Sequence, residues 1–129
     1  MASYTVGPGM TFEAGATLAA FTLVKMGSGG TITNSTGVAS EDNDVFGVVQ
    51  EAATSGDSVL VTHLNQVGSF KVKVGGAISK GAKVYTAASG KGSATGTSLT
   101  MIGLAREAAT ADGDIIEVLR VLGSNDDIS

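Results

Sequence analysis

The sequence predicts an all-β protein: a compact domain of barrel or sandwich type, built from two degenerate repeats, with an extended N-terminal arm and at most short helical turns. Composition, strand periodicity and an internal repeat support this prediction. Gly, Ala, Thr and Ser together supply 63 of the 129 residues, while aromatic residues make up 5% and Trp is absent. Many short strands and turns are typical of such a composition. The core must therefore be built mainly from Val, Leu, Ile and Ala.

The clearest strand is predicted over residues 69–74. Phe70, Val72 and Val74 alternate with polar residues, and a period of two with one apolar face indicates a half-buried strand. Further extended segments are predicted over residues 21–25, 45–50, 58–64, 83–86, 99–106 and 114–122. A short strand at 31–33 is expected within the polar loop 27–44, and residues 87–97 are expected to form a mobile hairpin tip.

The chain contains an internal repeat. FGVVQEAATSGD at residues 46–57 matches IGLAREAATADGD at 102–114, and both copies continue into alternating apolar residues. A fainter pair precedes them, because Gly15-Ala16 leading to Leu23-Val24 resembles Gly76-Ala77 leading to Val84-Tyr85. Two copies are too few for a solenoid. We therefore expect two halves, at about 15–67 and 76–122, that share one core.

The domain limits follow from these patterns. A single β-domain is predicted over residues 13–122, followed by a polar tail at 123–129. Residues 1–12 are predicted to form an arm, because Pro8 lies between two glycines and favours a hinge away from the body.

Composition excludes several classes of protein. The absence of cysteine excludes a disulfide framework, a thiolate metal site and a cysteine nucleophile. One histidine excludes a metal site built on two or three imidazoles. No apolar run approaches the ~18 residues of a membrane span, and the N-terminus lacks the pattern of a secretory signal. A net charge of −4 disfavours wrapping of a nucleic-acid backbone.

The charges are segregated along the chain. Residues 58–105 contain five lysines and no acid, whereas the remainder contains all 12 acids and three bases. The two parts could interleave in the fold and neutralise each other. Alternatively, the lysines could form a basic face that docks on an acidic partner.

No catalytic or ligand-binding motif is recognised. His63 has no acid or nucleophile placed beside it by a motif, and an interface or surface histidine is favoured. The acids at 41–44 lack the spacing of a calcium loop. The glycine-rich segments 27–30 and 90–92 lack the following helix of a phosphate loop. Six aromatics, four of them in strand patterns, make a stacking platform for nucleic acid or sugar improbable.

The repeated pattern resembles the capsid cement, or head decoration, family of tailed bacteriophages. The resemblance rests on Val45 to Ala53, on the Gly56-Asp57 turn, on Gly68 to Val74 and on Lys80 to Tyr85, and the second copy continues it. It covers about residues 13–122. It implies a non-enzymatic structural protein, without cofactors, that binds the outer surface of the mature phage head as a homotrimer and stabilises it against the pressure of packaged DNA.

The resemblance also implies partners and contacts. The partners would be the major capsid protein and other copies of the chain, with no direct contact to nucleic acid or membrane. The protein would be made in the bacterial cytoplasm and reside in the virion. Capsid contact is expected from the arm residues Tyr4, Val6, Met10 and Phe12, which alternate with polar residues or Gly and could add a strand to a capsid sheet. A disordered tail, or a strand paired within its own trimer, remains the alternative for this arm.

Two other hypotheses compete. A surface-exposed β-module that binds glycans or a receptor would need exposed aromatics or a metal site. A small hydrolase that uses Ser or Asp with Lys would need a motif that the sequence lacks.

Overall fold

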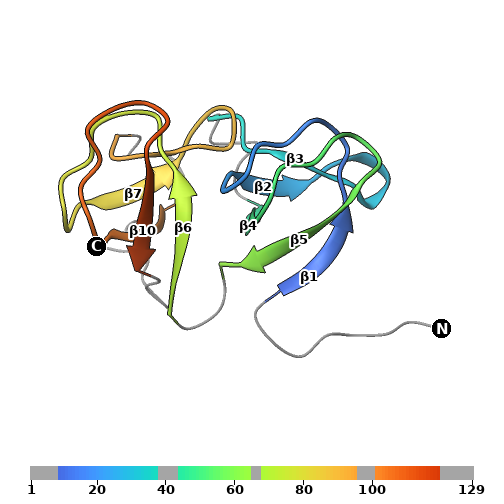
Figure 1. Cartoon of the computed structure of the whole chain (residues 1–129), viewed down its shortest axis with the longest axis horizontal. Helices are drawn as coiled ribbons and strands as arrows, with labels where there is room; N and C mark the ends of the chain where they lie inside the picture. The colour runs from blue at the N-terminus through green and yellow to red at the C-terminus, as the bar shows by residue number, and fades with distance from the viewer. Residues whose placement is uncertain (1–8, 38–43, 65–67, 96–100, 120–129) are drawn as a thin grey trace.

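The computed structural model describes residues 9–37, 44–64, 68–95 and 101–119, and it confirms the all-β prediction (Figure 1). These residues form two five-stranded sheets in which every strand pair is antiparallel. The only helical residues described are a single 3₁₀ turn, η1, at Ser28–Gly30, so no described helix is long enough to cross a membrane. The strands of the first sheet are β1 (Gly9–Glu13), β2 (Leu23–Met26), β3 (Ile32–Asn34), β4 (Val45–Val49) and β5 (Ser58–His63). Those of the second are β6 (Ser69–Lys73), β7 (Lys83–Thr86), β8 (Gly92–Ser93), β9 (Met101–Ala105) and β10 (Ile115–Leu119).

Each sheet curls toward a small barrel. The strand orders are β1-β5-β4-β2-β3 and β6-β10-β9-β7-β8, which are the same order in the two halves. A single parallel bridge brings the two ends of each sheet together, Ala14 with Ile32 in the first half and Val74 with Gly92 in the second. Closure of this kind reduces the length of exposed sheet edge.

The predicted internal repeat is present strand by strand. Even the local irregularity is repeated, because the register shifts between Val24 and Lys25 in one half and between Val84 and Tyr85 in the other. The fainter sequence match, which aligned Gly15 with Gly76, is wrong by one residue. The equivalent bridges of Ala14 and Val74 align Gly15 with Gly75. The halves also begin one strand earlier than expected, at β1 and β6.

Two segments that were not assigned to the strands of the domain contain strands. Residues 9–12, assigned to the arm from sequence, lie in β1, which pairs with β5 along its whole length. Residues 92–93, assigned to a mobile tip, form β8, and Gly90 before it is buried. β8 is too short to carry a periodic signal, whereas the alternation in β1 was read as a strand added to a partner.

The hydrophobic core is divided, which corrects the expectation of one shared core. The first half has its own cluster, and the second half has another that extends to the joint between the halves. Equivalent positions fill the two interiors. In the first half these are Ala14, Leu18, Val24, Val49, Ala53, Val59 and Val61. In the second half they are Val74, Ile78, Val84, Ala105, Ala109, Ile116 and Val118.

The two halves are joined by backbone hydrogen bonds and apolar packing. The Lys73 N–H donates to the Phe21 carbonyl at 2.7 Å, and the Leu23 N–H donates to the Gly90 carbonyl at 2.6 Å. Leu23, Val45, Val48 and Leu64 of the first half belong to the core cluster of the second. We therefore expect the halves to unfold together.

Candidate functional site

His63 lies at the end of β5 among aromatic rings, not beside catalytic groups. Its ring centroid is 5.6 Å from that of Phe46 and 6.4 Å from that of Phe12. Its Nε2 is buried and has no hydrogen-bond partner among the described residues. General-base catalysis would require a nucleophile within hydrogen-bond reach. The arrangement is that of a packed, partly buried histidine.

The four predicted contact residues fall into two groups. Tyr4 and Val6 lie outside the described residues. Met10 and Phe12 are both in β1 and are half-buried. The Phe12 ring packs against Phe46, with ring centroids 5.1 Å apart. Phe12 therefore helps to close the first core, whereas Met10 retains surface that a partner could cover.

The acidic segments lie in exposed turns where they are described. Residues 41–43 lie outside the described part, and Asp44 is exposed. Asp114 ends the 112–114 segment and accepts backbone N–H bonds from Thr110 at 2.8 Å and Ala111 at 3.1 Å, which is a turn-forming pattern. The described residues contain no group of three or more His, Cys, Asp or Glu side chains able to hold a metal ion.

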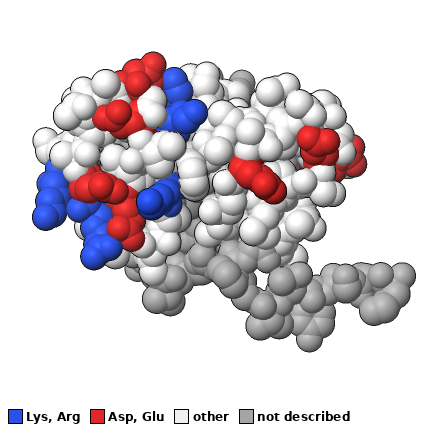
Figure 2. All heavy atoms as spheres, viewed as in Figure 1, with Lys and Arg blue, Asp and Glu red and all other residues white. Residues whose placement is uncertain are grey.

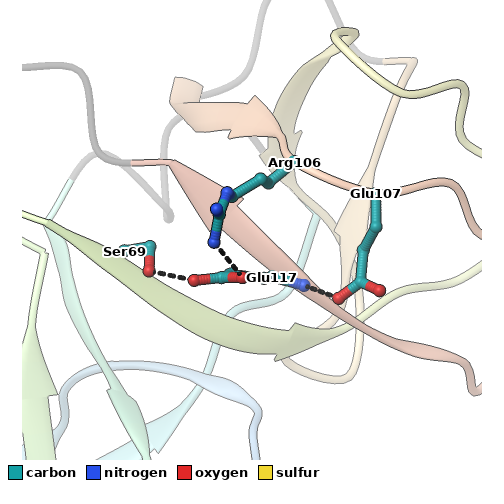
Figure 3. Close-up of polar contacts among 4 residues, drawn as sticks. All are labelled: Ser69, Arg106, Glu107 and Glu117. Atoms are coloured by element: carbon teal, nitrogen blue, oxygen red, sulfur yellow. Dashed lines mark hydrogen bonds and ion pairs between the residues drawn. The ribbon is translucent and has the colours of Figure 1, made fainter.

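A polar cluster surrounds Glu117 on the outer face of the second half (Figure 3). The Arg106 guanidinium donates to Glu117 Oε1 at 2.8 Å, and the Ser69 hydroxyl donates to Oε2. The Glu117 backbone N–H donates to Glu107 Oε2 at 2.7 Å. The hydrogen bond from Ser69, followed by that from Arg106, lowers the pKa of Glu117 below its usual value. Glu117 is thus held as a carboxylate, which suits a fixed ionic contact and not proton transfer.

This cluster borders a shallow groove between the halves. The groove has a volume of about 300 Å³, and its lining comes from both halves: Phe21, Gln50, Thr62, Ser69, Phe70, Lys71 and Glu117. Two exposed apolar side chains, Ile115 and Leu119, each 44% exposed, lie on β10 on the same face as Glu117. We call Ile115, Glu117, Leu119, Arg106 and Lys71 the β10 face. Exposed apolar side chains grouped on one face mark a candidate protein-binding surface.

Sequence reasoning did not identify the β10 face. Ser69 and Glu117 are 48 residues apart, and the pairing of β6 with β10 is what brings them together. One signal was available, because Ile115, Glu117 and Leu119 alternate with the core residues Ile116 and Val118. That alternation shows two apolar side chains on the outer face of a strand.

Three comparisons with known proteins bear on the family and fold of this chain. A family model described as phage cement protein matches residues 6–121. The solved structure of the head fiber gp8.5 N base of bacteriophage phi29 has a TM-score of 0.70, with 21% identity over 88% of this chain and 92% of that one. At this identity the structural match shows the fold alone. No curated protein sequence matches.

Proposed function

This chain belongs to the phage cement protein family, and from that premise we propose that it binds the outer surface of the mature phage head as a homotrimer and stabilises the shell against the pressure of packaged DNA. Membership of the family makes it a structural protein of the phage head. The proposal adds the major capsid protein as partner, the outer surface as location and synthesis in the bacterial cytoplasm. The match of the family model across residues 6–121 is the observation that carries it.

The described structure supports a binding role by the surface it offers. The β10 face combines two exposed apolar side chains with the Glu117 carboxylate, which accepts hydrogen bonds from Ser69 and Arg106. A preorganised surface loses little side-chain entropy when a partner covers it. Repetition of a modest contact over a symmetric shell adds avidity without a tight single site. We propose that the protein acts by such contacts and has no enzymatic activity.

Co-sedimentation with mature, undecorated phage heads tests the proposal directly. We expect saturable binding in a simple ratio to the three-fold positions of the shell, and greater resistance of decorated heads to heat or loss of divalent cations. Binding that does not saturate, or heads equally fragile with and without the protein, would overturn it.

Substitutions on the β10 face test whether this surface contacts the head. Leu119→Glu should weaken head binding about 10-fold or more, because a charge would replace a buried apolar contact. Leu60→Glu is the matched control, since Leu60 is 43% exposed at the position of β5 equivalent to Glu117 in β10. It should leave head binding unchanged. Equal binding by both variants would exclude the β10 face.

Deletion of residues 1–8 tests the arm. The structure refines where to cut, because removal of residues 1–12 would also remove β1 and open the first barrel. The shorter deletion leaves β1 in place, so we expect a folded protein with weaker head binding. Unchanged binding would assign Tyr4 and Val6 no part in the contact.

A further inference from the structure

The joint between the halves is made of two different surfaces. The first half contributes a turn surface, formed by Phe21, Leu23 and Val48, and the second half contributes an edge surface, formed by Phe70, Lys73 and Gly90. Two backbone hydrogen bonds connect them, from Lys73 N–H to the Phe21 carbonyl and from Leu23 N–H to the Gly90 carbonyl. Beside them, the segment after β3 also crosses the joint, where the Gly90 N–H donates to the Ser35 carbonyl at 3.2 Å and Thr36 bridges to Ala88.

The chain consists of two repeats, so each half contains a turn surface and an edge surface. The joint uses the turn surface of the first half and the edge surface of the second. The turn surface recurs in the second half at Gly81, Lys83 and Leu104, where β7 pairs with β9 in the register of β2 with β4. The Phe21 N–H donates to Val49 O at 2.9 Å, and the Gly81 N–H donates to Ala105 O at 2.7 Å. The backbone of the two turn surfaces is therefore the same.

The edge surface recurs in the first half at Met10, Glu13 and Gly30. The turn before β3 contains the bond from Thr31 N–H to Ser28 O at 3.4 Å, and the turn before β8 contains the equivalent bond from Lys91 N–H to Ala88 O at 3.3 Å. Both turns use left-handed backbone at the same two positions.

The joint covers one copy of each surface and leaves the other exposed. Leu23 and Val48 are fully buried, whereas Lys83 is exposed and Leu104 is half-buried. Gly90 is buried, whereas Gly30 is exposed. The turn leading into β7 and the turn linking β2 to β3 lie at opposite ends of the molecule (Figure 1). One chain therefore has an exposed turn surface at one end and an exposed edge surface at the other. These are the two kinds of surface that pack together in the internal joint.

Charge also favours a contact between these two surfaces. Residues 9–68 carry six acids and one lysine, and residues 69–119 carry six bases and four acids. On the face seen in Figure 2, the Lys and Arg side chains lie over the second half. Locally, Lys83 belongs to the exposed turn surface, Lys80 directly precedes Gly81 of that surface, and Glu13 belongs to the exposed edge surface. All three side chains are exposed. Opposite charges would meet in a head-to-tail contact.

We infer that the joint inside one chain is reused between chains: the turn surface of one copy packs on the edge surface of the next. In this contact the Glu13 N–H of one copy donates to the Gly81 carbonyl of its neighbour, as the Lys73 N–H does to Phe21 within a chain. The contact is head-to-tail, so it closes into a ring when the rotation permits and otherwise propagates. The inference rests on the proposed homotrimer, in which three copies close the ring.

Thiol crosslinking tests the contact, since the chain has no cysteine. We would prepare Glu13→Cys with Lys80→Cys in one full-length chain and treat it with a short bismaleimide at concentrations where light scattering shows an oligomer. We expect covalent species up to the trimer. Ala20→Cys with Lys73→Cys is the matched control, because these are the equivalent positions of the internal joint. It should crosslink within one chain, so that no covalent dimer or trimer forms.

The outcomes separate this inference from the proposed function. An oligomer without crosslinks between copies, alongside a crosslinked control, overturns the head-to-tail contact and leaves the trimer standing. A chain that remains monomeric at every concentration and on heads overturns both. Bands that extend without limit past the trimer confirm the contact but replace the ring with a filament.

Charge reversal supplies a second measurement. Glu13→Lys should weaken self-association about 10-fold, and combination with Lys80→Glu and Lys83→Glu should restore at least half of the lost binding free energy. Thr11→Lys is the control, since Thr11 is also exposed on β1 but is not part of the edge surface. Restoration by the combined variant confirms the pairing, and an additive further loss contradicts it.

Discussion

The two halves have the same fold but differ where the backbone is left-handed. Phe21 has a φ of 61°, and its counterpart Gly81 has a φ of 89°. In the turns before β3 and β8 the glycine is in the first half instead: Gly29 has a φ of 68°, and its counterpart Ser89 has a φ of 61°. Both non-glycine residues belong to turns of the joint, and both glycines are exposed. Strained backbone persists where surrounding contacts hold it in place.

Both halves have a glycine at the equivalent positions 47 and 103, because two strands approach closely there. A Cβ at Gly47 would lie 2.8 Å from the Thr62 carbonyl oxygen, and one at Gly103 would lie 2.4 Å from that of Leu119. These carbonyls belong to β5 and β10, the equivalent neighbouring strands. The shared glycine is therefore a packing requirement of each barrel, whereas the left-handed turns are free to differ.

The largest predicted effect tests whether the two cores depend on each other. Leu18→Ala and Ile78→Ala remove equivalent interior side chains, and each should lower the free energy of unfolding by about 2–5 kcal/mol. Because first-half residues complete the second core, both variants should still unfold in one transition, as followed by urea denaturation. Two separate transitions in either variant would mean that the halves are independent.

Substitution of the equivalent glycines in β4 and β9 should lower the free energy of unfolding by nearly as much. Gly47→Ala and Gly103→Ala should each lower the free energy of unfolding by about 1–3 kcal/mol, because the added methyl group must displace a backbone carbonyl. Gly76→Ala is the control, since a Cβ there meets nothing within 4 Å. Urea denaturation of the three variants provides the measurement. A tolerated alanine at only one of the two positions would show that the barrels pack differently.

The turn positions should respond in opposite ways. Gly81→Ala should destabilise the protein by about 1 kcal/mol, because a left-handed conformation is costly for a residue with a Cβ. Phe21→Gly removes that strain along with the ring, so it should be less destabilising than Phe21→Ala by about 1 kcal/mol. Thermal unfolding of the three variants compares these costs. Equal loss in the two Phe21 variants would show that residue 21 is not strained.

The smallest effect concerns acid stability of the two equivalent turns. Backbone hydrogen bonding to Thr54 is the main cause that lowers the pKa of Asp57, and bonding to Thr110 and Ala111 does the same for Asp114. A folded-state pKa below the unfolded value gives stability that is present above the unfolded pKa and is lost as pH falls through the folded pKa.

Tm should therefore decrease as pH falls from about 5 toward 2. Asp57→Asn and Asp114→Asn should each flatten this decrease, and Asp114→Asn should do so more, because Asp114 accepts bonds from two backbone N–H groups and Asp57 from one. Tm measured against pH for both variants checks the order. Parallel curves for the native protein and both variants would contradict it.

Much of the fold could be predicted because its signals are local. The alternation of Phe70, Val72 and Val74 located β6, and the repeated Gly-Asp turns located the hairpins that end at β5 and β10. The alternation of Met10 and Phe12 in β1 was recognised, but it was assigned to an arm that adds a strand to a partner, because Pro8 between two glycines indicates a hinge. β8 was missed because two residues, one of them Gly, carry no period.

The candidate surfaces were harder to predict, because they depend on residues distant in the chain. Glu117 alone is one more exposed acid; Arg106 and Ser69 give it a fixed position only after β6, β9 and β10 have paired. Phe21 was predicted to lie in an extended segment over residues 21–25, but β2 begins only at Leu23. In the structure it occupies a left-handed turn at the joint instead.

By itself, the sequence determined that this protein is all-β, that it consists of two related halves and that it resembles phage cement proteins, since periodicity and repetition are properties of neighbouring residues. Only the tertiary structure decided that the halves keep separate interiors, that one joint connects them and which outer faces stay exposed. The physical reason is that two halves with the same backbone can bury different copies of the same surface, and that choice is made by contacts between residues far apart in the chain.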